Sequence, residues 1–470
     1  MNDSIQSRRD HALALLRSNR LVEAKTLYSH ICQTDPRDAE SWNLLGAVHG
    51  MLGEFQEAEA CCRKVIALQP DAVGTYNNLG NTLKFQGKIR EAEQCYRQAL
   101  KLIPGYAEAH NNLGNLLKGR GELQEAEIHY RQAIASAPNY GDAHSNLGII
   151  LRDQGKLDDA VASYRRALQQ DPSHRDALYN LGLALFEKDE PVAAAGVFEQ
   201  LLGINPQDPG AMEFLGIAYT QLGEIDKAIE MYERTLELAP DRVDARYFLS
   251  ALGKEPVPAQ SPAEYVTRVF DTYAHKFDRH LLGKLSYQAP QLLCQAVMGV
   301  IRGERNDLEI LDLGCGTGLC GASFRNIARH LTGVDLSPKM IQKTRERGIY
   351  DELIVGDLLT PLRESNSRYD LITAADVFIY VGDLSQVLAG CQVALRPGGL
   401  FAFSTEREES TASYALRRSG RYAHAVDYIR TLANSSGFKE ISAEQAIIRQ
   451  EQRTPIDGNI FVFQKPRHAG

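Results

Sequence analysis

The first half of this chain repeats itself every 34 residues, and that period constrains its fold more than any other feature. Glycine occupies one column of the repeat, at Gly46, Gly80, Gly114, Gly148, Gly182 and Gly216. Alanine occupies a second, at Ala24, Ala58, Ala92, Ala126, Ala160, Ala194 and Ala228, and proline a third, from Pro36 to Pro240. Small residues let two antiparallel helices approach closely, and proline ends the second helix before the next unit. This pattern predicts helical hairpins stacked into a superhelix, each contacting only its neighbours.

A fourth column is aromatic, with one exception at Cys62. It comprises Tyr28, Tyr96, Tyr130, Tyr164, Phe198 and Tyr232. Four columns that keep one period resemble the tetratricopeptide repeat, a family of antiparallel helical hairpins. The resemblance implies about seven repeats over residues 1–250, with the aromatic side chain filling the gap between neighbouring hairpins. It also implies a concave inner face that binds a protein or peptide partner.

Asparagine recurs at one helical position in successive repeats, at Asn78, Asn112, Asn146 and Asn180. Asparagine is a poor helix former, so this repetition needs a cause. A similar ladder is found in the repeats of the O-linked N-acetylglucosamine transferase, which favours amides that grip the backbone of an extended peptide. Lys84 and Lys118 lie on a neighbouring stripe and would suit an acidic partner. Hydrogen bonds between adjacent repeats, or inheritance from repeat duplication, explain the ladder equally well.

The repeat pattern breaks at residues 251–261, which contain Pro256 and Pro258 and are followed at once by Pro262. Prolines this close together forbid a continuous helix and favour an extended spacer. The segment therefore predicts a linker between a repeat domain, residues 1–250, and a second domain, residues 262–470. Because few contacts are expected to cross such a linker, we expect the two domains to fold separately.

The second half is organised around the stretch from Glu309 to Gly318, where an apolar run ends in three alternate glycines. Such a run, followed by helix-competent sequence, predicts a buried parallel strand that turns sharply into a helix. Side chains at Gly314, Gly316 and Gly318 would keep the backbone away from a ligand. Read with the acidic Asp312 at the strand end, the stretch resembles the first motif of class I S-adenosylmethionine-dependent methyltransferases.

This second resemblance implies S-adenosylmethionine as the cofactor and assigns the residues that bind it. Asp335 ends the next predicted strand and would accept hydrogen bonds from the ribose hydroxyls, as in dinucleotide enzymes. Asp357 follows the third strand and would accept from the adenine amino group, with Leu358 near the ring. The expected cofactor contacts are Asp312, Gly314, Cys315, Gly316, Gly318, Asp335, Leu336, Asp357, Leu358 and Ala374.

The expected site of methyl transfer lies after the fourth predicted strand, residues 369–376. Asp376 and Tyr380 would flank the transferable methyl group there. Methyl transfer from a sulfonium is an in-line displacement from an activated donor, so positioning supplies much of the catalysis. A hydroxyl or carboxyl acceptor benefits from a base, and Asp376, Tyr380 and His424 are the candidates.

Arg421, Tyr422 and His424 form a cluster just after Ser419-Gly420, which we interpret as a helix cap. Related folds insert acceptor-binding elements in this part of the chain, and Arg421 would hold an acidic acceptor. Tyr273, on a predicted helix ahead of the glycine stretch, would line the same pocket. An exposed amphipathic helix start explains the cluster as well, and an apolar helix face packed on the sheet explains Tyr273.

Strand and helix patterns alternate beyond the glycine stretch, which predicts βαβ units and a mainly parallel sheet. Residues 441–449 and 459–464 read as a closing antiparallel pair joined by a turn at Asp457-Gly458. The predicted fold is an all-α repeat superhelix followed by a Rossmann-like, seven-stranded methyltransferase domain. A dinucleotide-dependent dehydrogenase is the competing interpretation, since residues 316–321 match its six-residue fingerprint. The predicted strand, however, ends at Gly314, out of register for that motif.

Charge and cysteine content exclude several other classes of protein. The chain has 52 basic and 60 acidic residues and a net charge of −8, so no global field would gather nucleic acid. Its eight cysteines show no metal-ligand spacing and read as reduced thiols, so we expect no metal. The absence of a signal-like or membrane-spanning run leads us to expect a soluble, cytoplasmic protein without membrane partners.

Three functions remain open from the sequence. The first is an active methyltransferase whose repeats recruit a protein or another large acceptor. The second keeps the enzyme but makes the acceptor a small metabolite, with the repeats serving assembly only. The third is an interaction scaffold whose methyltransferase half binds the cofactor without turnover. The intact glycines and the intact Asp335 and Asp357 favour an active enzyme.

Overall fold

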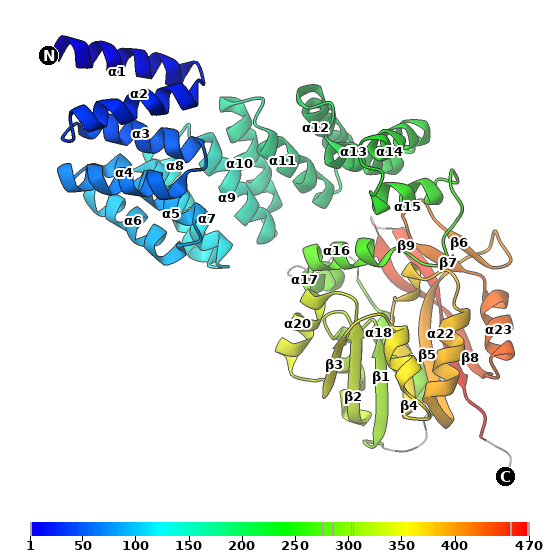
Figure 1. Cartoon of the computed structure of the whole chain (residues 1–470). Coiled ribbons are helices and arrows are strands. Elements are labelled where there is room, and N and C mark those ends of the chain that lie inside the picture. The colour runs from blue at the N-terminus through cyan, green and yellow to red at the C-terminus, as the bar shows by residue number, and fades with distance from the viewer. Residues whose placement is uncertain are drawn as a thin grey trace. The chain divides into compact units, whose positions relative to one another are not determined.

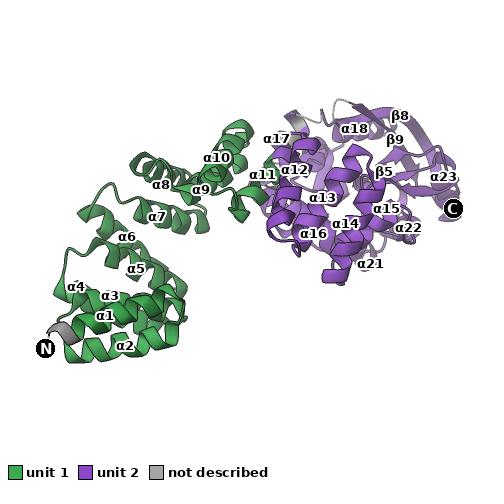
Figure 2. Cartoon of the chain, turned by 90° about the horizontal axis from the view of Figure 1, so that it is seen from above, with its two compact units in different colours: residues 1–184 green, residues 185–470 purple. Residues whose placement is uncertain are grey.

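The computed structural model describes residues 2–274, 277–283, 286–301, 303, 305–451 and 454–467. The chain divides into two compact units, Met1–Ala184 and Leu185–Gly470 (Figure 2). The later repeats therefore pack in the same unit as the sheet. Within the described ranges, no helix is long and apolar enough to cross a membrane.

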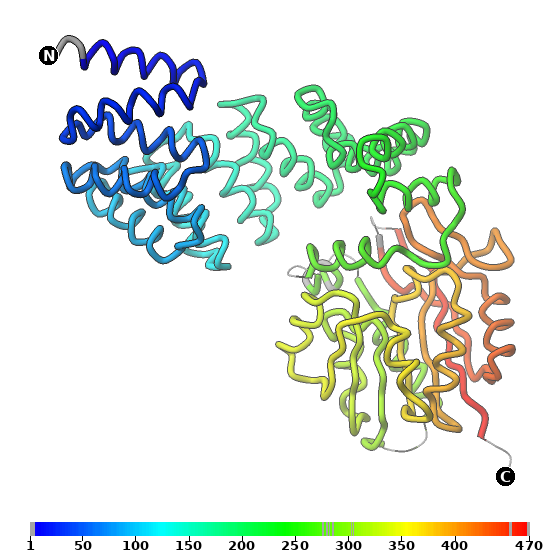
Figure 3. The backbone as a smooth tube through the Cα atoms, viewed as in Figure 1, coloured from blue at the N-terminus to red at the C-terminus, as the bar shows by residue number. Residues whose placement is uncertain are grey.

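Unit 1 is a series of antiparallel helical hairpins, drawn as a tube in Figure 3. The helices are α1 (Asn2–Arg17), α2 (Leu21–Thr34), α3 (Ala39–Met51), α4 (Phe55–Leu68), α5 (Val73–Phe85), α6 (Ile89–Leu102), α7 (Ala107–Gly119), α8 (Leu123–Ser136), α9 (Gly141–Asp153) and α10 (Leu157–Gln170), with α11 (Arg175–Glu187) running past the end of the unit. Each hairpin spans one 34-residue period, so the repeat architecture predicted from the columns is confirmed.

The glycine and aromatic columns meet inside each hairpin. A Cβ at Gly114 would lie 2.7 Å from a ring carbon of Tyr130, in the second helix of the same unit. At Gly46 the aromatic is replaced by Cys62, whose Sγ would lie 3.7 Å away, and the nearest atom would be Cβ of Cys61 at 3.1 Å. The glycine therefore makes room for the aromatic ring of its own hairpin. This contact lies within one hairpin, whereas the sequence predicted that the ring fills the gap between neighbouring hairpins. The alanines of the second column are fully buried beside them.

Unit 2 begins with the remaining repeat helices and continues into the helices that precede the sheet. These are α12 (Pro191–Ile204), α13 (Pro209–Leu222), α14 (Ile225–Leu238), α15 (Val243–Ala251), α16 (Ala263–Tyr273), α17 (Phe277–Gly283) and α18 (Ala289–Val300). The later helices are α19 (Leu319–Phe324), α20 (Pro338–Arg347), α21 (Leu359–Glu364), α22 (Ser385–Ala394) and α23 (Val426–Ser435).

A nine-stranded sheet forms the centre of unit 2, and its parallel strands run side by side from β3 to β5 in Figure 1. Its path is β3-β2-β1-β4-β5-β7-β6, with β9 pairing antiparallel to both β5 and β8. The strands are β1 (Leu308–Leu313), β2 (Ala328–Asp335), β3 (Glu352–Val355), β4 (Tyr369–Ala374), β5 (Leu395–Arg407), β6 (Tyr414–Leu416), β7 (Tyr422–His424), β8 (Lys439–Glu451) and β9 (Thr454–Gln464). The Rossmann-like methyltransferase fold is confirmed, and β6 and β7 are two short strands added to the seven expected.

Two local predictions near the C-terminus are wrong. Asp457 and Gly458 lie inside β9 and not in a turn, since β8 and β9 pair out to Glu451 and Thr454. Glycine is needed at position 458 because a Cβ there would lie 2.7 Å from the carbonyl oxygen of Thr405 on β5. The turn at Gly420 joins two strands of a hairpin and does not cap a helix.

The proline-containing segment is packed against the sheet domain, which contradicts the expectation of few contacts across it. The carbonyl oxygen of Ala259 accepts from the backbone N–H groups of Gly382 and Asp383, both at 2.8 Å. The backbone N–H of Ser261 donates to the carbonyl oxygen of Tyr380 at 2.8 Å. The three prolines do prevent a helix here. The extended backbone, however, keeps unpaired N–H and C=O groups, and these form hydrogen bonds to the sheet domain.

Candidate functional site

The glycine stretch forms a tight loop at the carboxyl end of β1. Gly314, Gly316 and Gly318 have φ angles of +62°, +54° and +90°, a region that side chains disfavour. A Cβ at Gly314 would also lie 2.6 Å from a methyl carbon of Val377. β1 pairs with β2 on one side and β4 on the other, so the loop sits where ligands bind in open parallel sheets.

Asp335 ends β2 beside this loop. One carboxylate oxygen accepts from the backbone N–H of Gly316 at 2.9 Å, and the other accepts from that of Ser337 at 2.8 Å. Burial raises the pKa of Asp335 to about 6, against the effect of those two donors. Each oxygen retains a lone pair for a further donor. Leu336, the next predicted contact, is half-buried at the same strand end.

Asp312 is buried, which corrects its predicted role as a cofactor contact. It is 1% exposed and accepts hydrogen bonds from the hydroxyls of Tyr350 at 2.6 Å and Thr373 at 2.8 Å. Burial raises its pKa above the usual value. The Tyr350 hydroxyl in turn accepts from the backbone N–H of Gly321 at 3.1 Å, so Asp312 acts by holding the helix that follows the loop.

The remaining predicted cofactor contacts divide into accessible and buried residues. Asp357 and Leu358 are half-buried after β3, where an Asp357 carboxylate oxygen accepts from the backbone N–H of Leu359 at 2.8 Å. Cys315 and Ala374 are buried, at 4% and 0% exposure, so neither side chain is available to a ligand. Burial also raises the pKa of the Cys315 thiol far above its usual value.

Helix α17 lies against the glycine loop. A Cβ at Gly316 would lie 3.7 Å from the ring of Phe277. Asp278 accepts a hydrogen bond from the Thr317 hydroxyl and pairs with Arg347. These contacts were missed by the sequence analysis, because no local pattern links α17 to residues about 40 and 70 positions further on.

A chain of aromatic rings connects the loop to the end of β4. Phe277 contacts Phe270 with ring centroids 5.8 Å apart, and Phe270 contacts Tyr380 at 5.4 Å. Tyr273 meets Phe277 edge-on at 5.7 Å. Tyr273 and Tyr380, predicted from different parts of the sequence, are thus brought to one aromatic cluster. Burial raises the pKa of both, and Arg421 opposes that rise.

Asp376 occupies a strained position at the same end of the sheet. Its φ is +56°, rare for a residue with a side chain, and such strain is typical of functional sites. Nη1 of Arg449 donates to an Asp376 carboxylate oxygen at 2.6 Å, and Nη2 of Arg449 donates to Glu406. Arg449 is 2% exposed. Arg449 and Glu406 were missed because a charged residue in an alternating strand pattern is normally solvent-exposed.

His424 is a core residue and not a base facing the site, which corrects its predicted role. It is fully buried, and its Nε2 lies 2.9 Å from the carbonyl oxygen of Val381 and 3.0 Å from that of Gly382. Two carbonyl acceptors require Nε2 to carry the proton. Burial lowers the His424 pKa to about 4. The neutral ring therefore holds the segment that follows Tyr380.

Tyr422 is also buried, and its hydroxyl donates to the carbonyl oxygen of Pro258 at 2.7 Å. The predicted role of Tyr422 in contacting the acceptor is therefore corrected to one in anchoring the proline segment. Arg421, its neighbour, is only half-buried and opposes the rise that burial causes in the pKa of Tyr380. Of the predicted cluster, Arg421 alone belongs with the aromatic residues around Tyr380.

The asparagine ladder of unit 1 bonds between adjacent repeats. Nδ2 of Asn112 donates to the amide oxygen of Asn77 at 2.9 Å, and Nδ2 of Asn146 donates to that of Asn111 at 3.0 Å. Asn180 is engaged by Arg152 and by its own helix. Inter-repeat bonding, one of the three open explanations, is thus present in the structure.

Part of the ladder nevertheless remains available to a ligand. The amide oxygens of Asn78, Asn112 and Asn146 accept no hydrogen bond from the residues that the structure describes. Lys84 and Lys118 are half-buried on the same helices, and Lys84 lies over the Phe85 ring at 5.4 Å. Burial lowers the pKa of Lys118.

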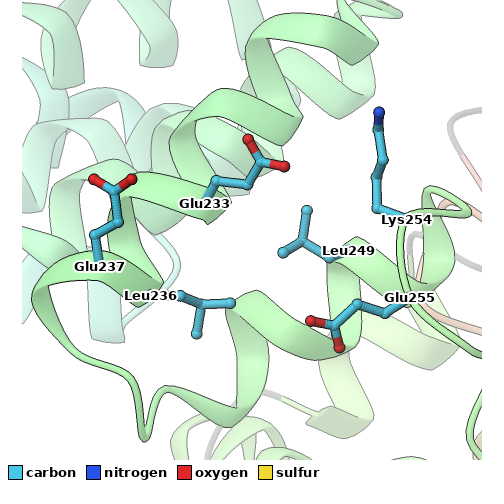
Figure 4. Close-up of a pocket in the computed structure, with 6 residues that line it drawn as sticks. All are labelled: Glu233, Leu236, Glu237, Leu249, Lys254 and Glu255. Atoms are coloured by element: carbon cyan, nitrogen blue, oxygen red, sulfur yellow. The ribbon is translucent and has the colours of Figure 1, made fainter.

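A separate depression lies between α14 and α15 (Figure 4). It is lined by Glu233, Leu236, Glu237, Leu249, Lys254 and Glu255. None of these residues comes from a strand end or from the glycine loop. It is therefore no part of the site described above.

Comparison with known proteins finds matches in both halves of the chain. Models of the tetratricopeptide repeat match residues 37–104, 75–139, 145–209 and 185–252, and a methyltransferase-domain model matches residues 310–399. The ubiquinone biosynthesis O-methyltransferase of Bordetella pertussis is 26% identical over 34% of this chain and 71% of its own. The malonyl-[acyl-carrier protein] O-methyltransferase of Pseudescherichia vulneris is 29% identical over 30% and 53%. Human methyltransferase-like protein 27 is 30% identical over 31% and 59%.

Solved structures resemble the chain only loosely. YrrB, a TPR protein with an unusual peptide-binding site, gives a TM-score of 0.36 at 22% identity over 40% of this chain and 96% of its own. PilF of Pseudomonas aeruginosa gives 0.42 at 18% identity over 46% and 99%.

The repeat columns, the sheet order and the matched family models together lead to one conclusion. This chain is a fusion of tetratricopeptide repeats to a class I methyltransferase domain.

Proposed function

We propose that this chain is an S-adenosylmethionine-dependent methyltransferase that methylates an oxygen atom, with its repeats bringing a protein acceptor or carrier to the site. The observation that supports it most is the loop after β1, whose three positive-φ glycines lie beside the carboxylate of Asp335. The printed names of two relatives specify O-methyl transfer, which favours an oxygen acceptor. We assign the repeats to residues 1–250 and the catalytic domain to residues 262–470.

The residues at the strand ends fit the proposed cofactor. Asp335 keeps one lone pair on each oxygen for the ribose hydroxyls, and Asp357 supplies a second carboxylate for the adenine amino group. Val355, at the end of β3, is 52% exposed, and with Leu358 it offers apolar surface for the ring. The glycine backbone admits the rest of the molecule. When bound, the sulfonium supplies an electrophilic methyl group.

The chain's own residues then orient the acceptor and receive its proton. The acceptor oxygen approaches between the end of β4 and the aromatic rings of Phe270 and Tyr380, which exclude water. We assign proton acceptance to the carboxylate of Asp376, held in place by Arg449. Arg421 provides a positive charge beside Tyr380 for an anionic acceptor.

The repeats supply a second binding surface for the acceptor or its carrier. The amide oxygens of Asn78, Asn112 and Asn146 accept no hydrogen bond within the described part of the chain and recur once per repeat, which suits the backbone N–H groups of an extended peptide. Lys118 adds a half-buried positive charge, so an acidic segment is the expected partner. The hydrogen bonds between adjacent repeats use the amide nitrogens of Asn112 and Asn146 and orient these side chains. Their amide oxygens therefore remain available to a ligand.

Labelled methyl transfer into a cell lysate tests the proposal. The full chain is incubated with methyl-labelled S-adenosylmethionine, and proteins are then separated from small molecules. We expect label in the protein fraction as a base-labile ester or an ether, lowered at least fivefold by Asn78→Ala with Lys118→Ala. Lys101→Ala, on the exposed face of α6, is the matched control. Label confined to small molecules and unchanged by the repeat variants would refute recruitment, and no label in either fraction would refute the enzyme.

A further inference from the structure

The last repeat helix reaches the acceptor end of the site. Tyr247 of α15 is 2% exposed, and its hydroxyl donates to the carbonyl oxygen of Gly420 at 2.8 Å. The same hydroxyl lies 2.7 Å from Oγ of Ser261. A tyrosine in a repeat thus bonds to two segments that lie 14 and 173 residues further along the chain.

Both segments carry residues of the proposed acceptor site. Gly420 directly precedes Arg421 in the β6–β7 turn, where the backbone N–H of Arg417 donates to the carbonyl oxygen of Arg421 at 2.8 Å. The backbone N–H of Ser261 donates to the carbonyl oxygen of Tyr380. The Tyr247 hydroxyl therefore bonds to the residue just before Arg421 and to Ser261, whose own backbone bonds to that of Tyr380.

Packing fixes the turn as well as hydrogen bonding. Gly420 has a φ of +76°, and a Cβ there would lie 3.2 Å from the ring of Phe248 and 3.4 Å from that of Tyr247. Tyr247 belongs to a buried cluster with Ala251, Leu416 and Tyr422. Two rings of α15 thus form the surface on which the turn rests, so this helix has a role beyond closing the repeat stack.

We propose that α15 is a working part of the acceptor site, and that Tyr247 is a positioning residue that holds Arg421 beside Tyr380. This inference rests on the proposed methyl transfer for its functional consequence, although the geometry is independent of it. Without the Tyr247 hydroxyl, the turn loses its tie to Ser261, and Arg421 is free to leave Tyr380. The catalytic domain cut off at residue 261 would then lose acceptor binding even for an acceptor that never touches the repeats.

Tyr247→Phe tests this proposal in the full chain, because it removes one oxygen and keeps the ring. Tyr28→Phe is the matched control, since Tyr28 is a buried repeat tyrosine whose hydroxyl has no hydrogen-bond partner among the described residues. Ser261→Ala breaks the same tie from the other side and serves as the second variant. All three are compared with the unaltered chain by calorimetry with S-adenosylhomocysteine, the demethylated product of the proposed cofactor.

Two readouts report the position of Arg421 without needing the acceptor. With tyrosine labelled by ¹³C at Cζ, the Tyr380 resonance, assigned through Tyr380→Phe, should move in Tyr247→Phe and in Ser261→Ala but not in Tyr28→Phe. Trypsin should cut the turn at Arg417 or Arg418 at least threefold faster in the same two variants. Affinity for S-adenosylhomocysteine should stay within twofold in all of them.

The rate of label transfer to the acceptor fraction supplies the functional readout. We expect Tyr247→Phe to raise the acceptor KM at least fivefold with a smaller change in kcat, because positioning of the bound anion is lost. A Tyr380 resonance and a trypsin rate unchanged in both variants would overturn the proposal. An unaltered chain that binds no S-adenosylhomocysteine would refute the proposed function instead, while the resonance and the cleavage rate would still test the positioning role.

Discussion

Cofactor binding should weaken in acid through Asp335, because this carboxylate has to be ionised to accept from two ribose hydroxyls while it also holds the loop. Burial raises its pKa to about 6, so the carboxylate is ionised at pH 7 and mostly protonated at pH 5. The ionised fraction falls tenfold for each pH unit below the pKa. The dissociation constant should therefore rise about tenfold between pH 7 and pH 5, which is about 1.4 kcal/mol.

Calorimetric titration of the full chain with S-adenosylhomocysteine between pH 5 and pH 7 measures this dependence. The ligand's α-amino group stays protonated over that range, since even the α-amino group of a peptide has a pKa of about 7.7–8.0. Asp335→Asn should bind at least tenfold more weakly at pH 7, since an amide replaces the anion and one acceptor of a backbone N–H is lost. Its dissociation constant should be nearly independent of pH. A flat profile for the unaltered chain, or a slope that survives in Asp335→Asn, would refute the role assigned to this carboxylate.

Three further predictions concern stability. Gly114→Ala should cost about 1–3 kcal/mol in urea unfolding, because its Cβ meets a buried tyrosine ring, whereas Gly46→Ala, which has a cysteine in place of that ring, should cost little. Burial next to Asp244 raises the pKa of Glu213 to about 7 from 4.5, so the folded chain binds a proton that the unfolded chain releases. Thermal stability should therefore fall as pH rises from 4.5 to 7, and Glu213→Gln should flatten that profile. Tyr350→Phe leaves a carboxylate oxygen of Asp312 and the backbone N–H of Gly321 without their hydroxyl partner, which should lower the free energy of unfolding by about 1–3 kcal/mol for each group. It should also speed hydrogen exchange at the start of α19.

Features that repeat or that follow a local period could be predicted from the sequence. The glycine, alanine and aromatic columns identified the repeats because the same residue types pack at the same positions in every hairpin. The loop from Gly314 to Gly318 could also be predicted, since three positive φ angles within five residues require glycine. The position of Asp335 beside this loop could be predicted because a parallel sheet brings the carboxyl ends of adjacent strands to one edge.

Features made by distant tertiary contacts could not be predicted in this way. The hairpin of β6 and β7 has strands of three residues, too short for any period to show. Buried charges such as Arg449 look like surface residues until their partners are known, and Glu406 lies 43 positions away. His424 was misread because a lone histidine near a predicted site gives no sign of whether its ring faces solvent or two backbone carbonyls.

The docking of the proline segment was missed for the same reason. Its composition predicts an extended backbone, and the structure has one, but composition cannot show what that backbone contacts. Ala259 and Ser261 hydrogen-bond to residues about 120 positions away, in a loop that itself follows β4. An experiment that removes the repeats at residue 261 therefore removes part of the proposed site as well.

Binding of S-adenosylmethionine to the full chain is the measurement that tests the central claim most directly. Calorimetry at pH 7 should show one site with a dissociation constant in the low-micromolar range or weaker, as is usual for metabolite sites. Asp335→Ala should weaken that binding by about 1–3 kcal/mol. No binding of S-adenosylmethionine or of its demethylated product, together with binding of NAD, would contradict the account.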